Sequence, residues 1–166
     1  MKDKKVLKEI ALIFVFMIII SGNVLTQELS NLDEVWIYNF GRCILNGLIP
    51  YKDFNIIVTP LFPYICAFLL KIFGNEMVVL RFAEIAEISL IIFMIYKILI
   101  KLKVDNIIAS LVSVGVYFLF KETYCFDYNW TVLLITLIVI YLELQDSQEK
   151  LNYSFKKEFF LGILVR

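Results

Sequence analysis

Long apolar runs separated by short charged stretches constrain this chain more than any other feature. They cover residues 6–25, 77–100, 104–120 and 130–144. A helix needs about 20 apolar residues to cross a bilayer, and these runs are close to that length. The chain is 61% hydrophobic with a mean hydropathy of +0.82, which is too apolar for an ordinary soluble domain. The sequence therefore predicts an all-α polytopic membrane protein with about four transmembrane helices.

A fifth apolar run, at residues 159–166, ends with the sequence. Eight helical residues rise only about 12 Å, whereas the hydrocarbon core of a bilayer is about 30 Å thick. We therefore expect residues 1–166 to be the N-terminal part of one larger transmembrane domain, with the fifth span cut short.

The N-terminus predicts the orientation of the chain in the membrane. Four lysines surround the start of the first run, and no A-x-A-like cleavage site follows that run: Lys2, Lys4, Lys5 and Lys8. This pattern indicates an uncleaved signal anchor whose basic end stays in the cytoplasm. The protein is thus expected to be a multi-pass protein of the cell membrane with an extracytoplasmic first loop, residues 26–76.

The segment Ile56–Phe73 could either cross the membrane or lie at its outer interface. If it does not cross, six later lysines join the N-terminal lysines in the cytoplasm, as the positive-inside rule favours: Lys97, Lys101, Lys103, Lys150, Lys156 and Lys157. Pro60 and Pro63 favour the same arrangement, because they break the segment and leave a helix too short to cross. The interfacial arrangement would place the segments around Asp33 and Asp127 on one outer face.

Residues 32–47 have the pattern of an amphipathic helix suited to the membrane interface. Gly47 can end this helix. Asp33 and Glu34 fall in its first turn, where negative charge is favoured by the helix dipole. They could therefore serve only the stability of the helix, or they could meet the head group of a lipid.

Composition excludes several classes of function. The net charge is zero, which gives no reason to expect binding to nucleic acid, and the absence of histidine leaves proton transfer to other side chains. Cys43, Cys66 and Cys125 are too widely spaced for a zinc or thioredoxin-type motif. Cys43 and Cys66 could still form a disulfide if their side of the membrane is oxidising.

The order of elements resembles the C-type (GT-C) superfamily of membrane glycosyltransferases. These elements are a basic start, one span, the Asp33-Glu34 pair, an amphipathic helix, "GLIPYKDF", the Pro-containing "TPLFPYICAFLLKIFGN", and Arg81 opening the next span. The protein mannosyltransferase-like and aminoarabinose-transferase-like branches are the most similar. The resemblance covers most of this chain but only the first third or so of such an enzyme, so the chain alone is expected to be inactive.

The resemblance implies a function and catalytic residues. It implies transfer of a sugar from a polyprenyl-phosphate donor, with inversion, to an envelope lipid, polysaccharide or protein on the outer face. Asp33 matches the catalytic acid of the first outer loop, with Glu34 beside it. Asp127 in "CFDYNW" matches a second acid that supports the site.

Other residues are candidates for binding the donor. Arg42, Lys52 or Arg81 could neutralise a departing phosphate, and exposed Tyr51 could contact the sugar. Six aromatic residues could stack on a sugar or simply form an aromatic belt at the interface: Trp36, Tyr38, Tyr51, Tyr124, Tyr128 and Trp130. A divalent cation shared by Asp33, Glu34 and Asp127 is a further possibility.

Arg81, Glu84 and Glu87 recur at intervals of three residues near the outer end of the second span. Charges at this depth usually face the interior of a helix bundle, so they could line a pocket. Alternatively, Arg81 and Glu84 could form a stabilising ion pair within the helix. The rival to a glycosyltransferase is a transport or scaffold protein that uses Glu84, Glu87 and Glu143 as relay or packing residues.

Overall fold

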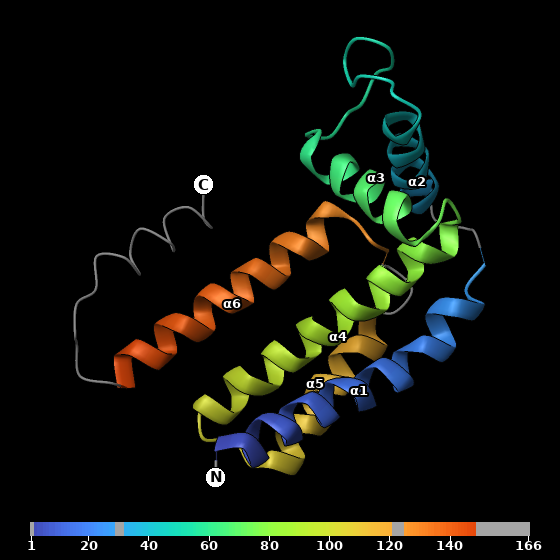
Figure 1. Cartoon of the computed structure of the whole chain (residues 1–166). Coiled ribbons are helices and arrows are strands. Elements are labelled where there is room, and N and C mark those ends of the chain that lie inside the picture. The colour runs from blue at the N-terminus through green and yellow to red at the C-terminus, as the bar shows by residue number, and fades with distance from the viewer. Residues whose placement is uncertain (1, 29–31, 121–124, 149–166) are drawn as a thin grey trace.

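The computed structural model describes residues 2–28, 32–120 and 125–148, and the regular elements in these ranges are all α-helices (Figure 1). They are α1 (Lys2–Thr26), α2 (Leu32–Leu45), α3 (Leu61–Phe73), α4 (Met77–Lys101), α5 (Asn106–Phe120) and α6 (Tyr128–Gln148). The predicted all-α class is therefore confirmed for this part of the chain. The predicted partial span at 159–166 lies outside the described residues.

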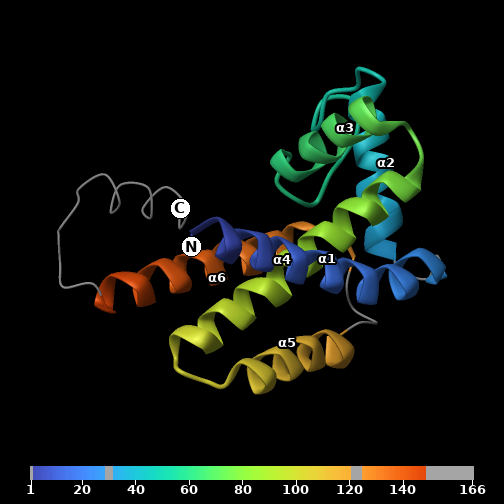
Figure 2. The same ribbon diagram turned by 60° about the horizontal axis from the view of Figure 1, so that its bottom comes forward.

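Helix α4 is the centre of the molecule, and α1, α5 and α6 each pack against it (Figures 1 and 2). Helices α2 and α3 pack on each other at the end of the bundle where α4 begins. The chain enters this end from α1 and α5 and leaves it through α4 and α6. The first and last residues of α4 therefore belong to two opposite ends of the bundle.

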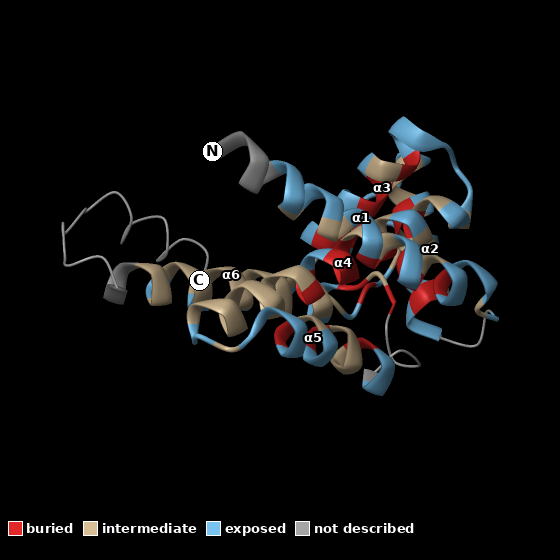
Figure 3. Ribbon diagram, turned by 90° about the horizontal axis from the view of Figure 1, so that it is seen from below, coloured by how far each residue is buried: buried red, intermediate tan, exposed pale blue. Residues whose placement is uncertain are grey.

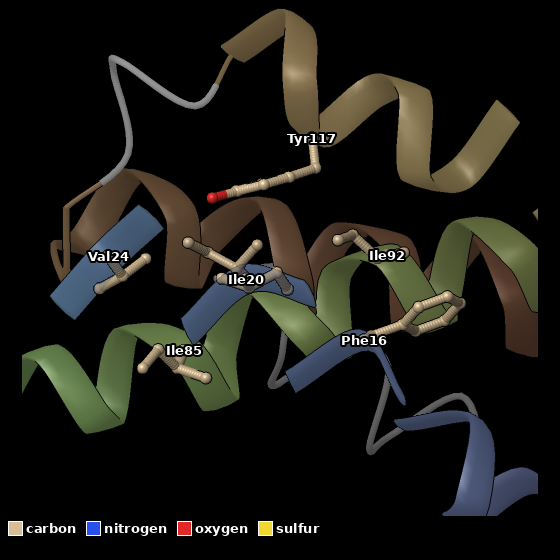
Figure 4. Packing of buried hydrophobic residues seen from close by; sticks show 7 residues of the cluster. Phe16, Ile20, Val24, Ile85, Ile92 and Tyr117 are labelled. Atoms are coloured by element: carbon tan, nitrogen blue, oxygen red, sulfur yellow. The ribbon is translucent and has the colours of Figure 1, made fainter. Parts of the chain in front are cut away.

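One hydrophobic core joins α1, α4 and α5. Phe16, Ile20 and Val24 recur at intervals of four on α1 and so share one face. This face meets Ile85 and Ile92 of α4, and the ring of Tyr117 from α5 packs against the same cluster (Figure 4). The apolar periodicity of α1 thus fixes which side of that helix faces the bundle.

A second core joins α2 to α3. Ile37 packs with Phe62, Cys66 and Leu70, and the cluster continues to α4 and to Phe126 in the segment before α6. Gly41 allows the two helices to approach closely, because a Cβ atom built there would lie 3.0 Å from the Cβ of Cys66. This second core fixes the position of the segment that carries Asp33.

The ends of α2 and α3 test two predictions. Gly47, at a φ of 86°, follows α2, and Leu48 N–H donates to the Cys43 carbonyl, so the prediction that glycine ends this helix is confirmed. The prediction that Pro63 breaks the next segment is wrong, because α3 already begins at Leu61. Pro63 lies in the first turn, where an N–H has no helical acceptor and proline is tolerated.

Two of the described helices, over Leu7–Thr26 and Tyr128–Gln145, are long and apolar enough to cross a membrane. Few residues of either segment are buried inside the molecule (Figure 3). By the same criteria the other two predicted spans fall short. Helix α4 carries five charged residues within its 25, and α5 has only 15 residues, which rise about 22 Å.

Candidate functional site

Asp33 and Asp127, although far apart in the sequence, line the same pocket. It has a volume of about 150 Å³ and lies between α2, the segment at Ile57 and Val58, and the start of α6. Trp36 and Tyr128 contribute aromatic rings to its wall. Such a volume accommodates several water molecules or a small polar group.

Asp127 holds the start of α6 in place. Its Oδ1 accepts hydrogen bonds from the backbone N–H groups of Asn129 (2.6 Å) and Trp130 (3.2 Å), which makes Asp127 the N-cap of α6. Its Oδ2 accepts from the thiol of Cys125 and from the side-chain amide of Asn129. Asp127 is buried, and its carboxylate is already hydrogen-bonded to the first N–H groups of α6. An aspartate directly before an apolar helix was the sequence signal for this role.

Asp33 differs from Asp127 in exposure. It lies in the first turn of α2 and is exposed, whereas Asp127 is 5% exposed. Of the two acids in the pocket, Asp33 is therefore the one that a solvent-borne or lipid-borne hydroxyl can reach.

Glu34, which is buried, forms an ion pair with half-buried Arg81 of α4. The Arg81 Nε donates to Glu34 Oε1 at 2.8 Å and its Nη2 to Oε2 at 3.4 Å, and the two side chains are 12% and 7% exposed. Of the two alternatives for Arg81, the ion pair with Glu84 is therefore wrong. The acidic partner of Arg81 comes from another helix, because α2 brings Glu34 against α4.

Glu84 and Glu87 are both buried on α4 and were absent from the predicted catalytic set. Glu87 Oε1 accepts a hydrogen bond from the hydroxyl of Thr131 on α6. Within the described residues, Glu84 Oε1 and Glu87 Oε2 have no hydrogen-bond partner. The alternative in which these residues face the bundle interior therefore agrees with their burial.

The other predicted binding residues lie outside the pocket of Asp33 and Asp127. Arg42 is exposed near the far end of α2, with its guanidinium 5.6 Å from the ring centroid of Tyr38. Tyr51 adopts a φ of 65° and donates its hydroxyl hydrogen to the carbonyl of Val58 at 2.9 Å. Tyr51 therefore holds Val58, one of the residues that line the pocket. Lys52 is exposed in the same turn.

The predicted metal ligands do not assemble. In the described ranges, no three side chains of histidine, cysteine, aspartate or glutamate lie close enough together to hold a metal ion. Glu34 is paired with Arg81, and the carboxylate of Asp127 is bound to the start of α6. Asp33, Glu34 and Asp127 therefore do not fit a shared cation.

The cysteines are buried or half-buried thiols. Cys43 and Cys66 are both free, so the disulfide considered for them is not formed. Burial, with a smaller contribution from Glu87, raises the pKa of Cys66 to about 12. Burial and the neighbouring Asp127 likewise raise the pKa of Cys125. Neither thiol is therefore a ready thiolate for nucleophilic or metal chemistry.

An apolar pocket of about 560 Å³ lies between α3 and α4. Phe73, Val78, Phe82 and Ala86 are among its lining residues, and every described residue of its wall is apolar. Phe82 directly follows Arg81 in the chain, so this pocket adjoins the helix end that carries the ion pair.

Comparisons with models of protein families, with curated proteins and with solved structures found no match to this chain.

Proposed function

We propose that this chain forms part of a membrane glycosyltransferase that takes a sugar from a polyprenyl-phosphate donor on the outer face of the cell membrane. The observation that supports this most is the pocket that Asp33 and Asp127 share. The pocket supplies an accessible acid, Asp33, and an aromatic wall, and such a transfer needs both a base and a surface that can bind a sugar.

The proposed membrane placement has α1, α4, α5 and α6 crossing the bilayer, with α2 and α3 at the outer interface. Two of these helices meet the length and composition criteria for a span. Apolar side chains such as Phe14, Ile18, Leu111 and Leu119 are exposed on the bundle, as contact with lipid requires. Glu84 and Glu87 are buried instead, as expected for acids within a span.

In the proposed reaction Asp33 acts as the base. It takes the proton of the acceptor hydroxyl while that oxygen bonds to the anomeric carbon of the sugar. The bond from the anomeric carbon to the phosphate oxygen breaks, and its electron pair leaves with the polyprenyl phosphate. Arg81 is the proposed group that meets the departing phosphate, since an arginine has donors beyond the two that Glu34 uses. Attack opposite the phosphate inverts the anomeric centre.

Donor turnover in native membranes tests the role of Asp33. Asp33→Asn is introduced at the chromosomal locus, and release of polyprenyl phosphate from a labelled polyprenyl-phosphate hexose is measured in membranes. We expect turnover to fall by about 10²–10⁴-fold, the usual contribution of a general base. Glu76→Gln is the matched control, because Glu76 is an exposed acid at the same end of the bundle without a side-chain capping bond. Near-normal turnover in Asp33→Asn membranes would reject the proposal.

Labelling from outside the cell tests the placement separately. Cysteines are introduced in place of Lys52, at the end of the bundle with α2, and of Lys103, just after α4; both positions are exposed. A membrane-impermeant maleimide should label Lys52→Cys in intact cells and Lys103→Cys only after permeabilisation. Labelling of both in intact cells contradicts the placement.

A second candidate, proton-linked transport, rests on the unpartnered oxygens of buried Glu84 and Glu87. Glu143, the third residue of this hypothesis, is exposed on α6 and so has a different environment. The double variant Glu84→Gln and Glu87→Gln distinguishes the two functions. It should abolish proton-linked uptake if the chain is a transporter.

A further inference from the structure

The loop between α2 and α3, residues 46–60, forms one wall of the pocket that Asp33 and Asp127 share. It extends beyond both helices at the top of Figure 1. Ile57 and Val58 of this loop line the pocket, together with residues of α2 and of the start of α6. A loop in such a position on a helical scaffold can determine what the pocket accepts.

Hydrogen bonds close the first half of the loop on itself. The Oδ2 of Asp53 accepts from the Ile49 N–H at 2.8 Å, and the Asp53 N–H donates to the Ile49 carbonyl at 2.9 Å. The Tyr51 N–H donates to the Phe54 carbonyl at 2.9 Å. Tyr51 itself adopts a φ of 65°, a conformation that a residue with a side chain keeps only where its surroundings hold it. This turn is therefore held in one conformation.

Two further contacts join the turn to the wall of the pocket. The hydroxyl of Tyr51 donates to the carbonyl of Val58 at 2.9 Å. The ring of Phe54 stacks on the ring of Phe40, with their centroids 6.0 Å apart, and Phe40 also lines the pocket. The wall is thus formed before a ligand arrives, which lowers the conformational cost of binding.

Ile57 lies at the mouth of the pocket. It lines the pocket and yet is 88% exposed, more than any other large apolar residue in the described part of the chain. A branched apolar side chain in this position gains free energy when a ligand covers it. Its neighbour Val58 is already half-buried. Of these two wall residues, Ile57 therefore has more surface for a ligand to cover.

We propose that Ile57 contacts the sugar of the donor and that Tyr51 is the positioning residue that holds this part of the wall in place. Binding sites combine apolar walls with a few polar groups that fix the orientation of the ligand. Ile57 supplies apolar surface for the C–H face of a sugar ring and takes no part in proton transfer. The inference rests on the proposed function, because it concerns the same pocket.

Donor turnover in native membranes, measured over a range of donor concentrations, tests the proposal. Ile57→Ser should raise the KM for a labelled polyprenyl-phosphate hexose about tenfold and leave kcat nearly unchanged, because it removes a contact made equally before and during the reaction. Ile57→Val keeps a branched apolar side chain and should stay within about fourfold of the native KM. Tyr51→Phe removes only the hydroxyl that holds Val58 and should raise KM about threefold.

Two variants of α3 are matched controls. Ile72 and Tyr64 are 54% and 48% exposed, and neither belongs to the described wall of this pocket. Ile72→Ser and Tyr64→Phe should therefore keep the native KM. A native KM in Ile57→Ser overturns the proposed contact, and a native KM in Tyr51→Phe overturns the positioning role. A rise in Ile72→Ser as large as that in Ile57→Ser overturns the assignment to the pocket.

Asp33→Asn, measured in the same membranes, distinguishes failure of this inference from failure of the proposed function. Turnover that is lost in Asp33→Asn while Ile57→Ser keeps the native KM rejects only the role of the loop. Near-normal turnover in Asp33→Asn rejects the proposed function, and the role of the loop with it. Because Ile57 is so exposed, its replacement should leave folding intact, and an unchanged melting temperature of the full chain checks this.

Discussion

The two ends of the bundle carry opposite charge and hold it in different ways. At the end with α2 and α3, buried acids have specific partners: Glu34 binds Arg81, and Asp127 caps α6. At the other end, lysines are partly exposed, and Lys97 and Lys101 lie against aromatic rings. Two buried acids of the first end are thus held by defined hydrogen bonds, whereas the partly exposed lysines of the second end combine one ion pair, Lys97 with Glu9, with contacts to aromatic rings.

Helix α4 contributes to both ends, which explains why the contrast is so clear. Its first turns bring Arg81, Glu84 and Glu87, and its last turns bring Lys97 and Lys101. The two ends of α4 also differ in burial, since Glu84 and Glu87 are buried, whereas Lys97 and Lys101 are not. Substitutions at the acidic end should therefore cost more stability than equivalent ones at the basic end.

The largest effect is expected from Arg81→Met. It leaves the buried carboxylate of Glu34 without its partner, which costs about 3–5 kcal/mol of unfolding free energy. Unfolding in mixed micelles, followed by circular dichroism, measures the loss. The double variant Glu34→Leu and Arg81→Met should recover most of it, because it leaves no unpaired charge. A double variant as unstable as Arg81→Met would contradict the role assigned to the pair.

Gly41→Val should disturb the packing of α2 against α3. A side chain there meets the Cβ of Cys66 at 3.0 Å and the backbone N of Ala67 at 3.3 Å. Such overpacking costs about 1–3 kcal/mol. Gly22→Ala is the control, because a Cβ atom at Gly22 meets nothing within 4 Å. Melting temperatures that change equally in both variants would show that the close approach is unimportant.

Asp127→Ala should cost about 1 kcal/mol through loss of the N-cap of α6. Asp127→Asn keeps an oxygen that can accept from the same N–H groups and should retain most of the stability. Thermal unfolding separates the two variants. Equal destabilisation by alanine and asparagine would show that the charge, rather than the cap, matters.

The smallest effect is expected at the basic end. Lys97→Gln removes the ion pair with Glu9, whose side chain is 32% exposed, and should cost about 0.5–1 kcal/mol. Chemical unfolding of Lys97→Gln and of Arg81→Met, measured side by side, gives the difference in lost stability between the two ends. A cost for Lys97→Gln as large as that for Arg81→Met would remove the contrast on which this comparison rests.

The helices themselves were largely predictable, because their signals are local. The predicted runs at 77–100 and 130–144 overlap α4 and α6, and the amphipathic pattern at 32–47 overlaps α2. The prediction that Pro63 breaks the segment 56–73 was wrong, because proline is compatible with a first helical turn. That prediction required knowing where the helix begins, which proline alone does not specify.

The site was only partly predictable. Asp33 and Asp127 were chosen from the order of elements, and they do line one pocket. Arg42 and Lys52 were chosen as lone basic residues near the same loop, and they lie elsewhere. An ion pair within its own helix was one of the two alternatives for Arg81, whereas α2 provides its partner, Glu34. Each failure concerns a contact between segments distant in the chain.

The sequence by itself determined the all-helical class, the apolar character of the helices and the concentration of lysines near certain helix ends, because these depend on composition and periodicity. Only the tertiary structure decided that Glu34 meets Arg81, that Asp33 and Asp127 share a pocket, and that Lys97 of α4 pairs with Glu9 of α1. The physical reason is range: hydropathy and helix propensity act within a few residues, whereas an ion pair or a pocket depends on how separate helices pack.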